Sequence, residues 1–497
     1  MLFNSYPFLF VFLPITLLIF YGLRRIGRRD LCIPFLMLAS LAFYSYWMPR
    51  DLPILLATVI WNFLFAGYLA RPSAPRRKLA LVAAISGNLG LLAYFKYFDF
   101  VVGNVAHLLG FGYLPRGVPL PIGISFFTFT QIAYLVDCYR SRECETKFVN
   151  YGLFVTVFPH LIAGPIIHHA QMRPQFLRLI RESIDPRMVA LGVPILIVGL
   201  AKKVLLADNL AALADPVFAA ADKAVHLSAG SAWLGVIAYT LQIYFDFSGY
   251  SDMAVGLGLL FGLRFPVNFD SPYRSTSIIE FWRRWHITLS TWLRDYLYFS
   301  LGGNRSGEVK RLRNVAITML LGGIWHGAGW TFVIWGALHG AYIVVNHVAR
   351  KFRPPTKSSQ PKRMLGFAKW TVTMSLVMLG WVFFRAKSVP AAFDVLRSIG
   401  AGWNGADGIR ALDILDYGWL LIAGAIAFLA PNTQEIFDYS AQTTKSPSAP
   451  AYSFFGPKDR AWSIDGTSAI AAVLMGALAA GVLASLWRPA IFIYFNF

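Results

Sequence analysis

Charged side chains are scarce in this sequence, and their scarcity excludes an ordinary soluble domain. Asp, Glu, Lys and Arg together make up 14% of the 497 residues. Typical soluble domains carry about 25%. Hydrophobic residues make up 57%, and the mean hydropathy is +0.54. The composition alone therefore indicates a polytopic membrane protein.

Cysteine is also rare, and two common catalytic motifs are missing. Cys32, Cys138 and Cys144 offer neither a disulfide framework nor metal-ligand spacing. Neither a GxxxxGK[ST] phosphate loop nor an HExxH zinc helix occurs in the sequence, so ATP hydrolysis and metalloprotease chemistry lack support. We expect no metal site and no tightly bound cofactor.

Long uncharged runs dominate the sequence. The first run, Tyr6–Leu23, has no basic region before it and no small-residue cleavage site after it, so we interpret it as a first helix and not as a removable signal peptide. We predict an all-α polytopic membrane protein with about 11 or more transmembrane helices. The spanning candidates are Tyr6–Leu23, Cys32–Trp47, Ile54–Leu69, Leu79–Phe95, 120–137, 188–206, 230–247, 328–348, 366–384, 412–430 and 467–487.

The formal net charge of +20 follows from membrane topology, because the basic residues are concentrated in a few loops. We therefore expect no nucleic-acid partner. Of the 45 Lys and Arg residues, 31 lie in the six segments 24–29, 71–78, 140–147, 173–187, 264–313 and 350–369. The positive-inside rule makes their side cytoplasmic. The loops expected on the other side, 48–53, 96–119 and 208–228, are poor in basic residues. We therefore expect an extracytoplasmic N terminus.

Two segments depart from simple spans. Residues 148–170 are apolar but interrupted by Pro159 and Gly164-Pro165, which favours a re-entrant segment surrounded by protein. Residues 315–327 are short and glycine-rich.

The segment 270–313 is too charged to span a membrane. Indexed as one helix, it has an apolar stripe that includes three tryptophans, an opposite arc of Arg and Asp, and His286 on the flank of the stripe. A helix in the headgroup plane and a cytosolic helix packed on the membrane domain both fit this pattern. The residues of the stripe are Trp282, Trp285, Leu289, Trp292, Leu293 and Tyr296.

His326 lies in the uncharged stretch Leu320–Trp330. An imidazole at apolar depth is costly unless it is hydrogen-bonded or functional. From residue type alone, a hydrogen bond to a neighbouring helix explains His326 as well as catalysis does.

Three other clusters place polar groups in apolar surroundings. They are His160 with Pro165, the segment Gln242–Asp252, and His286. The segment Gln242–Asp252 holds two Asp, two Ser and two Tyr at the end of a predicted span, where they either bind substrate or cap helices.

His339 is different, because it lies within the GxxxG spacing of Gly336 and Gly340. That spacing indicates close helix packing and not a site.

In combination, these motifs resemble the membrane-bound O-acyltransferase family. The resemblance follows the chain in order over nearly its whole length. Within the family it is most similar to the bacterial alginate O-acetyltransferase branch, with the D-alanyl transferases of teichoic acid as close relatives. The motifs are Phe158-Pro-His160-Leu-Ile-Ala-Gly-Pro165, Gln242-Ile-Tyr-Phe-Asp-Phe-Ser-Gly-Tyr-Ser-Asp252, Phe281-Trp-Arg-Arg-Trp-His286, Leu301-Gly-Gly-Asn304-Arg, Gly322-Gly-Ile-Trp-His326-Gly-Ala and Tyr494-Phe-Asn-Phe.

The resemblance implies a ring of helices around a thinned centre, pierced by a channel in which donor and acceptor meet from opposite sides. It places the catalytic histidine at His326 and a second polar site residue at His286. His160 matches a position characteristic of the alginate branch. We expect substrate contacts at His160, Gln242, Asp246, Ser248, Asp252, Trp285, Ser290, Asn304 and Trp325.

The implied function is acyl transfer across the bacterial inner membrane. A cytoplasmic thioester, either acetyl-CoA or an acyl carrier protein, would give its acetyl group to a hydroxyl of an alginate-like exopolysaccharide or of a periplasmic relay protein. His326 would act as general base. His286 would orient the thioester or stabilise the oxyanion. The arginines Arg283, Arg284 and Arg294 would attract the anionic donor, although the positive-inside rule also explains them.

Four alternatives compete with this function. Ser290, four residues after His286, would be the nucleophile of a covalent route. The chain could transfer D-alanine to teichoic acid. A transporter of acyl groups or saccharides would use the histidines as proton relays. A scaffold for a polysaccharide export complex would need none of them.

We expect one integral membrane domain over the whole chain. It would comprise N-terminal helices over 1–138, a catalytic core over 139–350 with a cytoplasmic layer at 264–313, and C-terminal helices over 366–497.

Overall fold

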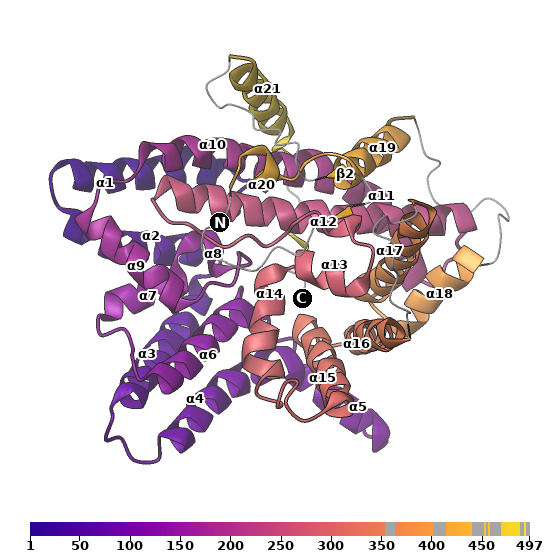
Figure 1. The fold of residues 1–497 in the computed structure, drawn as a ribbon, viewed down its shortest axis with the longest axis horizontal. Coiled ribbons are helices and arrows are strands. Elements are labelled where there is room, and N and C mark those ends of the chain that lie inside the picture. Colours follow the sequence, from indigo (N-terminus) through magenta and orange to yellow (C-terminus); the bar gives the residue numbers. More distant parts are fainter. Residues whose placement is uncertain are drawn as a thin grey trace. The chain divides into compact units, whose positions relative to one another are not determined.

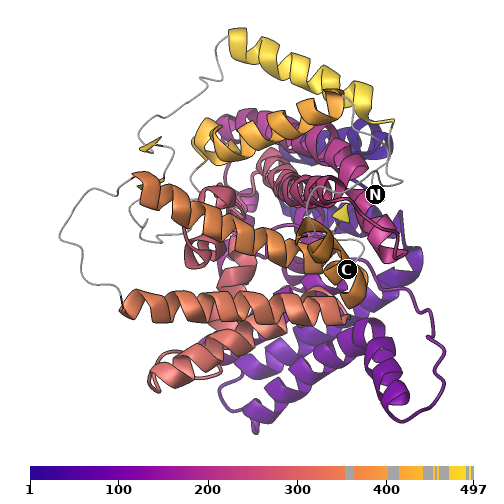
Figure 2. The same ribbon diagram turned by 90° about the vertical axis from the view of Figure 1, so that its right-hand side faces the viewer.

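Helices make up nearly all of the regular secondary structure of the described residues (Figure 1; Figure 2). The structure is a computed structural model, and it describes residues 1–352, 363–400, 414–439, 452–453, 456–457, 469–487 and 492–493. Within these ranges, the β structure is one antiparallel ladder of two-residue strands, β1 (Tyr452–Ser453) and β2 (Gly456–Pro457). The predicted all-α class is confirmed. The C-terminal motif 494–497 lies outside the described residues.

The chain divides into two compact units. The first comprises Met1–Leu200, Tyr250–Pro266 and Leu486–Phe495. Its helices are η1 (Pro7–Phe12), α1 (Leu13–Arg25), η2 (Arg29–Leu31), α2 (Cys32–Ser45), η3 (Pro49–Asp51), α3 (Leu52–Ala70), α4 (Arg77–Leu92), η4 (Ala93–Tyr97), α5 (Phe98–Leu108), α6 (Ile124–Ser141), α7 (Phe148–Thr156), α8 (Phe158–Leu161), α9 (His169–Arg181) and α10 (Pro186–Ala201).

The second unit comprises Ala201–Gly249, Val267–Ser485 and Asn496–Phe497. The predicted single domain and its subdivisions stay a prediction. The helices of this unit are η5 (Lys202–Ala207), α11 (Asp208–Asp222), α12 (Ala229–Leu260, up to Gly249), η6 (Pro272–Arg274), α13 (Ile278–Arg284), α14 (Ile287–Trp292), η7 (Leu293–Tyr298), α15 (Glu308–His326), α16 (Trp330–Lys351), α17 (Arg363–Arg385), α18 (Val389–Gly400), α19 (Ile414–Phe428), α20 (Thr433–Ile436) and α21 (Ala469–Ser485).

Every predicted span falls on a helix wherever the structure describes it. By length and composition, six described helical stretches can cross a membrane, and two further apolar helices, Leu415–Phe428 and Ala472–Ser485, are shorter. The protein is a polytopic, all-α membrane protein, while the count of about 11 crossings stays a prediction. The six stretches are Pro7–Arg25, Pro49–Ala70, Arg77–Leu108, Pro186–Asp222, Trp330–Lys351 and Met364–Arg385.

Two predicted loops are largely helical, which corrects the sequence analysis. The helix from Arg77 continues to Leu108 through the π-helical turn η4, and the helix from Pro186 continues to Asp222 through η5. The two predicted spans, Leu79–Phe95 and 188–206, end just before the charged residues Lys96 and Asp208. Lys96 in η4 does not end the helix, and its ammonium group donates to Ser125 Oγ at 3.3 Å.

Side-chain amides hold the helices of the first unit together. Asn62 of α3 exchanges hydrogen bonds of 2.9 and 2.7 Å with Asn88 of α4, and it also donates to Gln131 of α6 at 3.1 Å. Gln131 in turn donates to Thr58 and accepts from Tyr151 of α7, each at 3.1 Å. These buried groups satisfy one another across four helices, as polar groups inside membrane bundles must. Figure 1 shows α3, α4 and α6 packed together.

The interrupted segment 148–170 forms two short helices within the first unit. Helix α7 ends at Thr156, Val157 has a non-helical backbone, and Pro159 lies in the first turn of α8. Proline is tolerated there because its missing N–H would have no helical partner. All residues from Tyr151 to Ile167 are buried. The predicted interruption is therefore present, and it is enclosed by protein.

Helices α15 and α16 pack closely through glycines (Figure 1; Figure 2). A Cβ added to Gly323 of α15 would lie 2.4 Å from the Phe332 carbonyl oxygen, and one added to Gly336 of α16 would lie 2.7 Å from the Met319 carbonyl oxygen. The backbones therefore touch where a larger residue would hold them apart. The predicted packing role of the GxxxG spacing is confirmed.

The predicted amphipathic helix of the segment 270–313 is broken within its apolar stripe. Helix α13 ends at Arg284, His286 has a left-handed backbone with φ of +43°, and α14 begins at Ile287. The sequence contains neither proline nor glycine at this break, so nothing in its pattern indicated one. Most of the predicted stripe is nevertheless buried, including Trp282 and Trp292.

The motif Gln242–Asp252 lies in the interior of α12, which continues to Leu260. This corrects the expectation that it ends a helix. All its residues are buried, so they do not serve as terminal caps.

Candidate active site

His326 is the last residue of α15, and Gly327 after it is fully extended. Three aromatic side chains surround the imidazole. Its ring centroid lies 4.9 Å from Trp325, 5.0 Å from Trp335 of α16 and 5.1 Å from Phe384 of α17. His326 is 5% exposed. The second unit therefore places this histidine at a helix end in an aromatic enclosure contributed by three helices.

His339 extends this enclosure, although the sequence analysis assigned its helix to packing alone. Its ring lies 4.8 Å from Trp335 on the same helix. The indole N–H of Trp282 in α13 donates to His339 Nδ1 at 3.2 Å. The bond joins α13 to α16. Nothing in the sequence related Trp282 to a residue 57 positions away.

Tryptophan side chains also connect the neighbourhoods of the two predicted catalytic histidines. Trp285, next to His286, lies 4.9 Å from Trp381 of α17. Trp381 lies 5.4 Å from Phe384, which contacts His326. The predicted site residue Trp285 thus belongs to the same aromatic cluster as the enclosure of His326. Trp381 and Phe384 were missed, because α17 carries no His, Asp, Glu, Asn or Gln that would have suggested a site.

His286 is fully buried at the junction of α13 and α14. Its Nδ1 lies 3.1 Å from Asn268 Oδ1, and its ring packs edge-on against Phe247 at 4.6 Å. Burial lowers the pKa of His286 to about 3, so the imidazole is neutral at physiological pH. A neutral imidazole can exchange protons with a substrate, whereas an imidazolium has no lone pair to offer.

A short backbone ladder holds His286 in place. The amide of Ile287 donates to the Asn268 carbonyl, and the amide of Asp270 donates to the Arg284 carbonyl, each at 3.0 Å. The chain before η6 thereby lies beside the break between α13 and α14. This ladder supports the left-handed backbone of His286, which is costly for a residue with a side chain.

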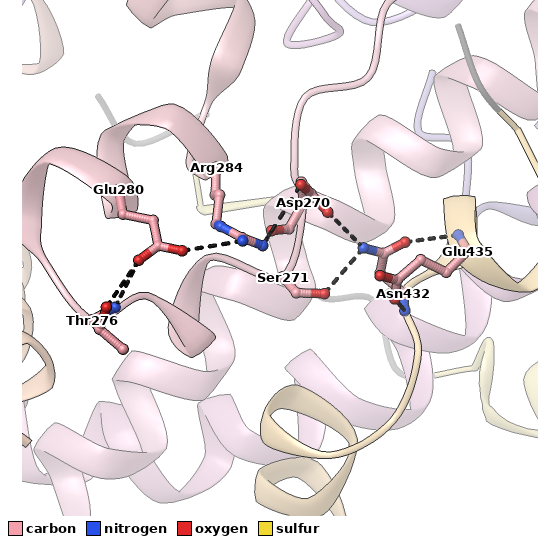
Figure 3. A network of polar contacts seen from close by, with 7 residues as sticks. All are labelled: Asp270, Ser271, Thr276, Glu280, Arg284, Asn432 and Glu435. Carbon is pink, nitrogen blue, oxygen red and sulfur yellow. Dashed lines mark hydrogen bonds and ion pairs between the residues drawn. The ribbon is translucent and has the colours of Figure 1, made fainter. Parts of the chain in front are cut away.

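A polar network anchors that ladder (Figure 3). Arg284 lies 3.1 Å from Glu280 and 3.6 Å from Asp270. Asn432 donates to Asp270 at 3.1 Å and to Ser271 at 3.0 Å. Asn432 also forms a capping box with Glu435 at the start of α20. Residues more than 160 positions apart therefore fix the support of His286.

The three arginines expected to attract the donor differ in their surroundings. Glu280 and Asp270 neutralise Arg284, and Asp295 pairs with Arg294 at 2.6 Å. Arg283 is exposed. Its attraction of an anionic donor stays a prediction.

Asp246 of α12 contacts a buried lysine. Lys203 Nζ lies 2.7 Å from both Asp246 Oδ1 and Asp208 Oδ1. The exposed fractions of these side chains are 5% for Lys203, 1% for Asp246 and 11% for Asp208. Asp246 was predicted to contact substrate, and Lys203 was not predicted as its partner. In the structure Asp246 forms part of a buried ion cluster.

The other predicted contacts of the second unit are more dispersed. Gln242 and Ser248 are buried in α12, and neither Gln242 Oε1 nor Ser248 Oγ has a hydrogen-bond partner among the described residues. The Ser290 hydroxyl donates to the Trp285 carbonyl at 3.5 Å. Asn304 is exposed in the turn before α15. Their substrate contacts stay predictions.

Two predicted site residues belong to the first unit. His160 Nε2 lies 3.0 Å from the Phe154 carbonyl oxygen, and Gly164 packs against the His160 backbone, where an added Cβ would lie 2.4 Å from Cα. Asp252 is buried in the last part of α12. The described residues of both units form no cluster of three or more His, Cys, Asp or Glu suited to a metal ion.

Two buried histidines, one at a helix end and one at a helix break, lie in a membrane protein of apolar helices, where a buried ionisable residue indicates a functional site. Residues 41–386 match the membrane-bound O-acyltransferase family, and the chain belongs to that family. The protein is therefore an O-acyltransferase, as the motifs predicted.

Individual relatives are similar over most of their length. The peptidoglycan O-acetyltransferase of Helicobacter pylori is 42% identical over 437 residues, which cover 82% of this chain and 80% of the relative. The probable alginate O-acetylase AlgI of Pseudomonas aeruginosa is 41% identical over 466 residues, with coverages of 91% and 85%. The teichoic acid D-alanyltransferase of Streptococcus thermophilus is more distant, at 26% over 405 residues with coverages of 76% and 93%.

Proposed function

We propose that this protein transfers an acetyl group from a cytoplasmic thioester to a hydroxyl of a cell-surface polysaccharide, directly or through a periplasmic relay protein. The supporting observation is His326, a buried imidazole at the end of α15, in a chain of the O-acyltransferase family. The relatives with acetyl-transfer names are more than 40% identical, whereas the D-alanyl transferase is 26% identical. Acetyl is therefore favoured over D-alanyl.

His326 is the general base of this reaction. One of its ring nitrogens takes the proton of the acceptor hydroxyl while that oxygen attacks the thioester carbonyl carbon. The carbon–sulfur bond then breaks, the sulfur leaves as a thiolate, and the proton passes from His326 to the thiolate. The products are an ester and a free thiol. The surrounding aromatic rings limit access of water, which would otherwise hydrolyse the thioester.

The donor is acetyl-CoA or an acetylated carrier protein, since both present the acetyl group as a pantetheine thioester. The basic segments, the cytoplasmic layer at 264–313 and the N terminus outside the cytoplasm define the orientation that we propose for the bacterial inner membrane. The donor would approach from the basic side.

The acceptor is an alginate-like exopolysaccharide. Peptidoglycan is the second candidate, because the relative named for it has the same level of identity as the relative named for alginate. Both acceptors present sugar hydroxyls. They are distinguished by acetyl analysis of each polymer from cells with and without this protein.

The decisive experiment combines purified protein, an acetyl-labelled pantetheine donor and a polysaccharide acceptor. His326→Ala is expected to lower transfer by roughly 10²–10⁴-fold, the range for a positioned base. His347→Ala is the matched control. His347 is also a histidine of the second unit, and it lies 3.4 Å from Arg311. The control should retain full activity.

Three outcomes would contradict the proposal. Full transfer by a folded His326→Ala variant would show that His326 is not the general base. Translocation with the thioester unchanged would indicate a transporter, and loss of transfer in Ser290→Ala with a trapped acyl-enzyme in the wild type would indicate the covalent route.

A further inference from the structure

The two ring nitrogens of His286 have different surroundings. Nδ1 lies 3.1 Å from Asn268 Oδ1. Nε2 is buried and has no hydrogen-bond partner within the part of the chain that the structure describes. Buried side-chain nitrogens are paired in the large majority of cases. A histidine that only filled the core would be expected to form hydrogen bonds through both ring nitrogens. Nε2 is therefore the nitrogen whose role is still to be assigned.

The contacts of Asn268 determine which nitrogen carries the proton. The Thr288 amide donates to the Asn268 side chain at 3.2 Å, and the Thr288 hydroxyl does so at 3.0 Å. A backbone amide can only donate, so the atom it meets is the amide oxygen. That oxygen cannot donate to His286. Nδ1 of the neutral ring must therefore carry the proton, and Nε2 must be unprotonated.

We infer that Asn268 is a positioning residue that fixes His286 in the Nδ1–H tautomer and so presents Nε2 to a substrate as a hydrogen-bond acceptor. The inference rests on the proposed function and specifies what the second histidine recognises. A thioester carbonyl and an oxyanion offer only lone pairs, which an unprotonated nitrogen repels. Nε2 instead meets a group that donates, namely the acceptor hydroxyl or an amide N–H of the pantetheine arm.

The backbone supports the same geometry. Asn268 accepts from the Ile287 amide at 3.0 Å through its own carbonyl, so its side chain and backbone both bind the turn that carries His286. Asn268 is 2% exposed. Its side chain therefore has little freedom to leave the histidine.

The tautomer can be measured directly. In ¹⁵N NMR spectra of histidine-labelled protein, protonated and unprotonated imidazole nitrogens have distinct shifts. His339 is an internal reference of the opposite tautomer, because Trp282 donates to its Nδ1. His286→Gln and His339→Gln assign the resonances. A protonated Nδ1 in His286 supports the inference, and a protonated Nε2 overturns it.

A double-mutant cycle tests the positioning role. Asn268→Ala is expected to lower kcat/KM on the order of 10–100-fold, as loss of a group that orients a working imidazole does. In a His286→Ala background the same change should have little further effect. Asn268→Asp keeps the accepting oxygen and should retain more activity than Asn268→Ala. Equal losses from Asn268→Ala in both backgrounds would overturn the role.

Asn314→Ala provides the matched control. Asn314 is a buried asparagine of the same unit that donates to the Leu301 and Gly303 carbonyls at 3.0 Å. Any loss caused by this change should be the same with and without His286. We predict a loss that depends on His286 only for Asn268→Ala. If Asn314→Ala also loses its effect in the His286→Ala background, the cycle does not single out Asn268.

Separate KM values identify the group that His286 meets. A higher KM for the polysaccharide in Asn268→Ala indicates the hydroxyl, and a higher KM for the thioester indicates the pantetheine amide. Unchanged KM and kcat would overturn the inference. If the wild type transfers no acetyl group, the proposed function fails, whereas the NMR measurement still decides the tautomer.

Discussion

At the scale of single residues, His286 couples folding to pH. Burial lowers its pKa to about 3 in the folded protein, whereas an unperturbed histidine has a pKa of about 6.5. Between these values the unfolded chain binds the proton and the folded protein does not. Its contribution to the stability is therefore complete above about pH 6.5 and is lost as the pH falls through that value toward 3.

We expect His286→Gln to make the unfolding free energy less sensitive to acid. Between about pH 7 and pH 5, the variant should lose on the order of 2 kcal/mol less than the wild type, because it lacks the titrating group. Unfolding of detergent-solubilised protein at the two pH values measures the difference. His226→Gln changes an exposed histidine and should behave as the wild type. Equal acid sensitivity in all three proteins would refute the expectation.

Lys203 is the second residue whose substitution gives a defined result. Lys203→Met leaves Asp208 and Asp246 buried without their cation, which should destabilise the protein by about 3–5 kcal/mol. Lys202→Met removes a bond to Thr433 and should cost only about 1 kcal/mol. Thermal unfolding compares the two. The double variant Lys203→Met/Asp246→Asn should recover part of the loss, and no recovery would argue against the ion cluster.

The histidines could be recognised from the sequence by their unusual surroundings, but their partners could not. His326 and His286 stood out because an imidazole in an apolar or aromatic context is rare. Asn268 did not, because an isolated asparagine between Val267 and Phe269 has no pattern to distinguish it. Its contact with His286 follows from a backbone turn, and spacing along the chain does not encode that turn.

At the scale of elements, the glycine contact between α15 and α16 positions the helix that ends in His326. Gly323→Ala would place a Cβ 2.4 Å from the Phe332 carbonyl oxygen, so the helices must separate. We expect a loss of roughly 1–3 kcal/mol, typical of overpacking, together with reduced acetyl transfer. Thermal unfolding and the transfer assay measure the two effects.

The control for this prediction is Gly476→Ala in α21. An added Cβ there meets nothing within 4 Å. Alanine favours a helix over glycine by up to about 1 kcal/mol, so this variant should be unchanged or slightly more stable. Equal losses at both positions would contradict the prediction, because the close contact exists only at Gly323.

Apolar length predicted the helices well, but charge predicted their ends poorly. The runs ended where Lys96 or Asp208 appeared, yet the helices continue through both residues. Hydrogen-bond partners explain the difference. Ser125 of α6 binds Lys96, and Lys203, five residues earlier in the same helical stretch, binds Asp208. Conversely, the predicted helix that carries the stripe Trp282–Tyr296 had no visible stop, and the break at His286 depends on a backbone ladder with residues 268–270.

At the scale of the whole molecule, the distribution of basic residues predicts a sidedness that labelling can test. With Cys144 replaced by Ser, the remaining cysteines, Cys32 and Cys138, are buried. An impermeant thiol reagent applied to intact cells should label a cysteine at His226 and spare one at Ser183. Both positions are exposed, so accessibility to solvent does not separate them.

Cell lysis provides the control for this labelling. Both cysteines should react once the membrane is broken. Labelling of the cysteine at Ser183 in intact cells would reverse the proposed orientation.

Composition was sufficient to predict the class of molecule but not its division into units. Low charge and long apolar runs are properties of the whole chain. The units, in contrast, join distant segments: in the first, Arg24 donates to the Leu179 carbonyl at 2.6 Å across 155 positions. No periodicity in the sequence records such a contact.

The left-handed backbone at His286 has an evolutionary consequence. At a φ of +43°, glycine would relieve a strain of about 1 kcal/mol that histidine must carry. Stability alone would therefore favour glycine at this position, whereas the role that we propose for His286 requires an imidazole. Under that proposal, the position is a trade-off in which the protein gives up some stability to keep its chemistry.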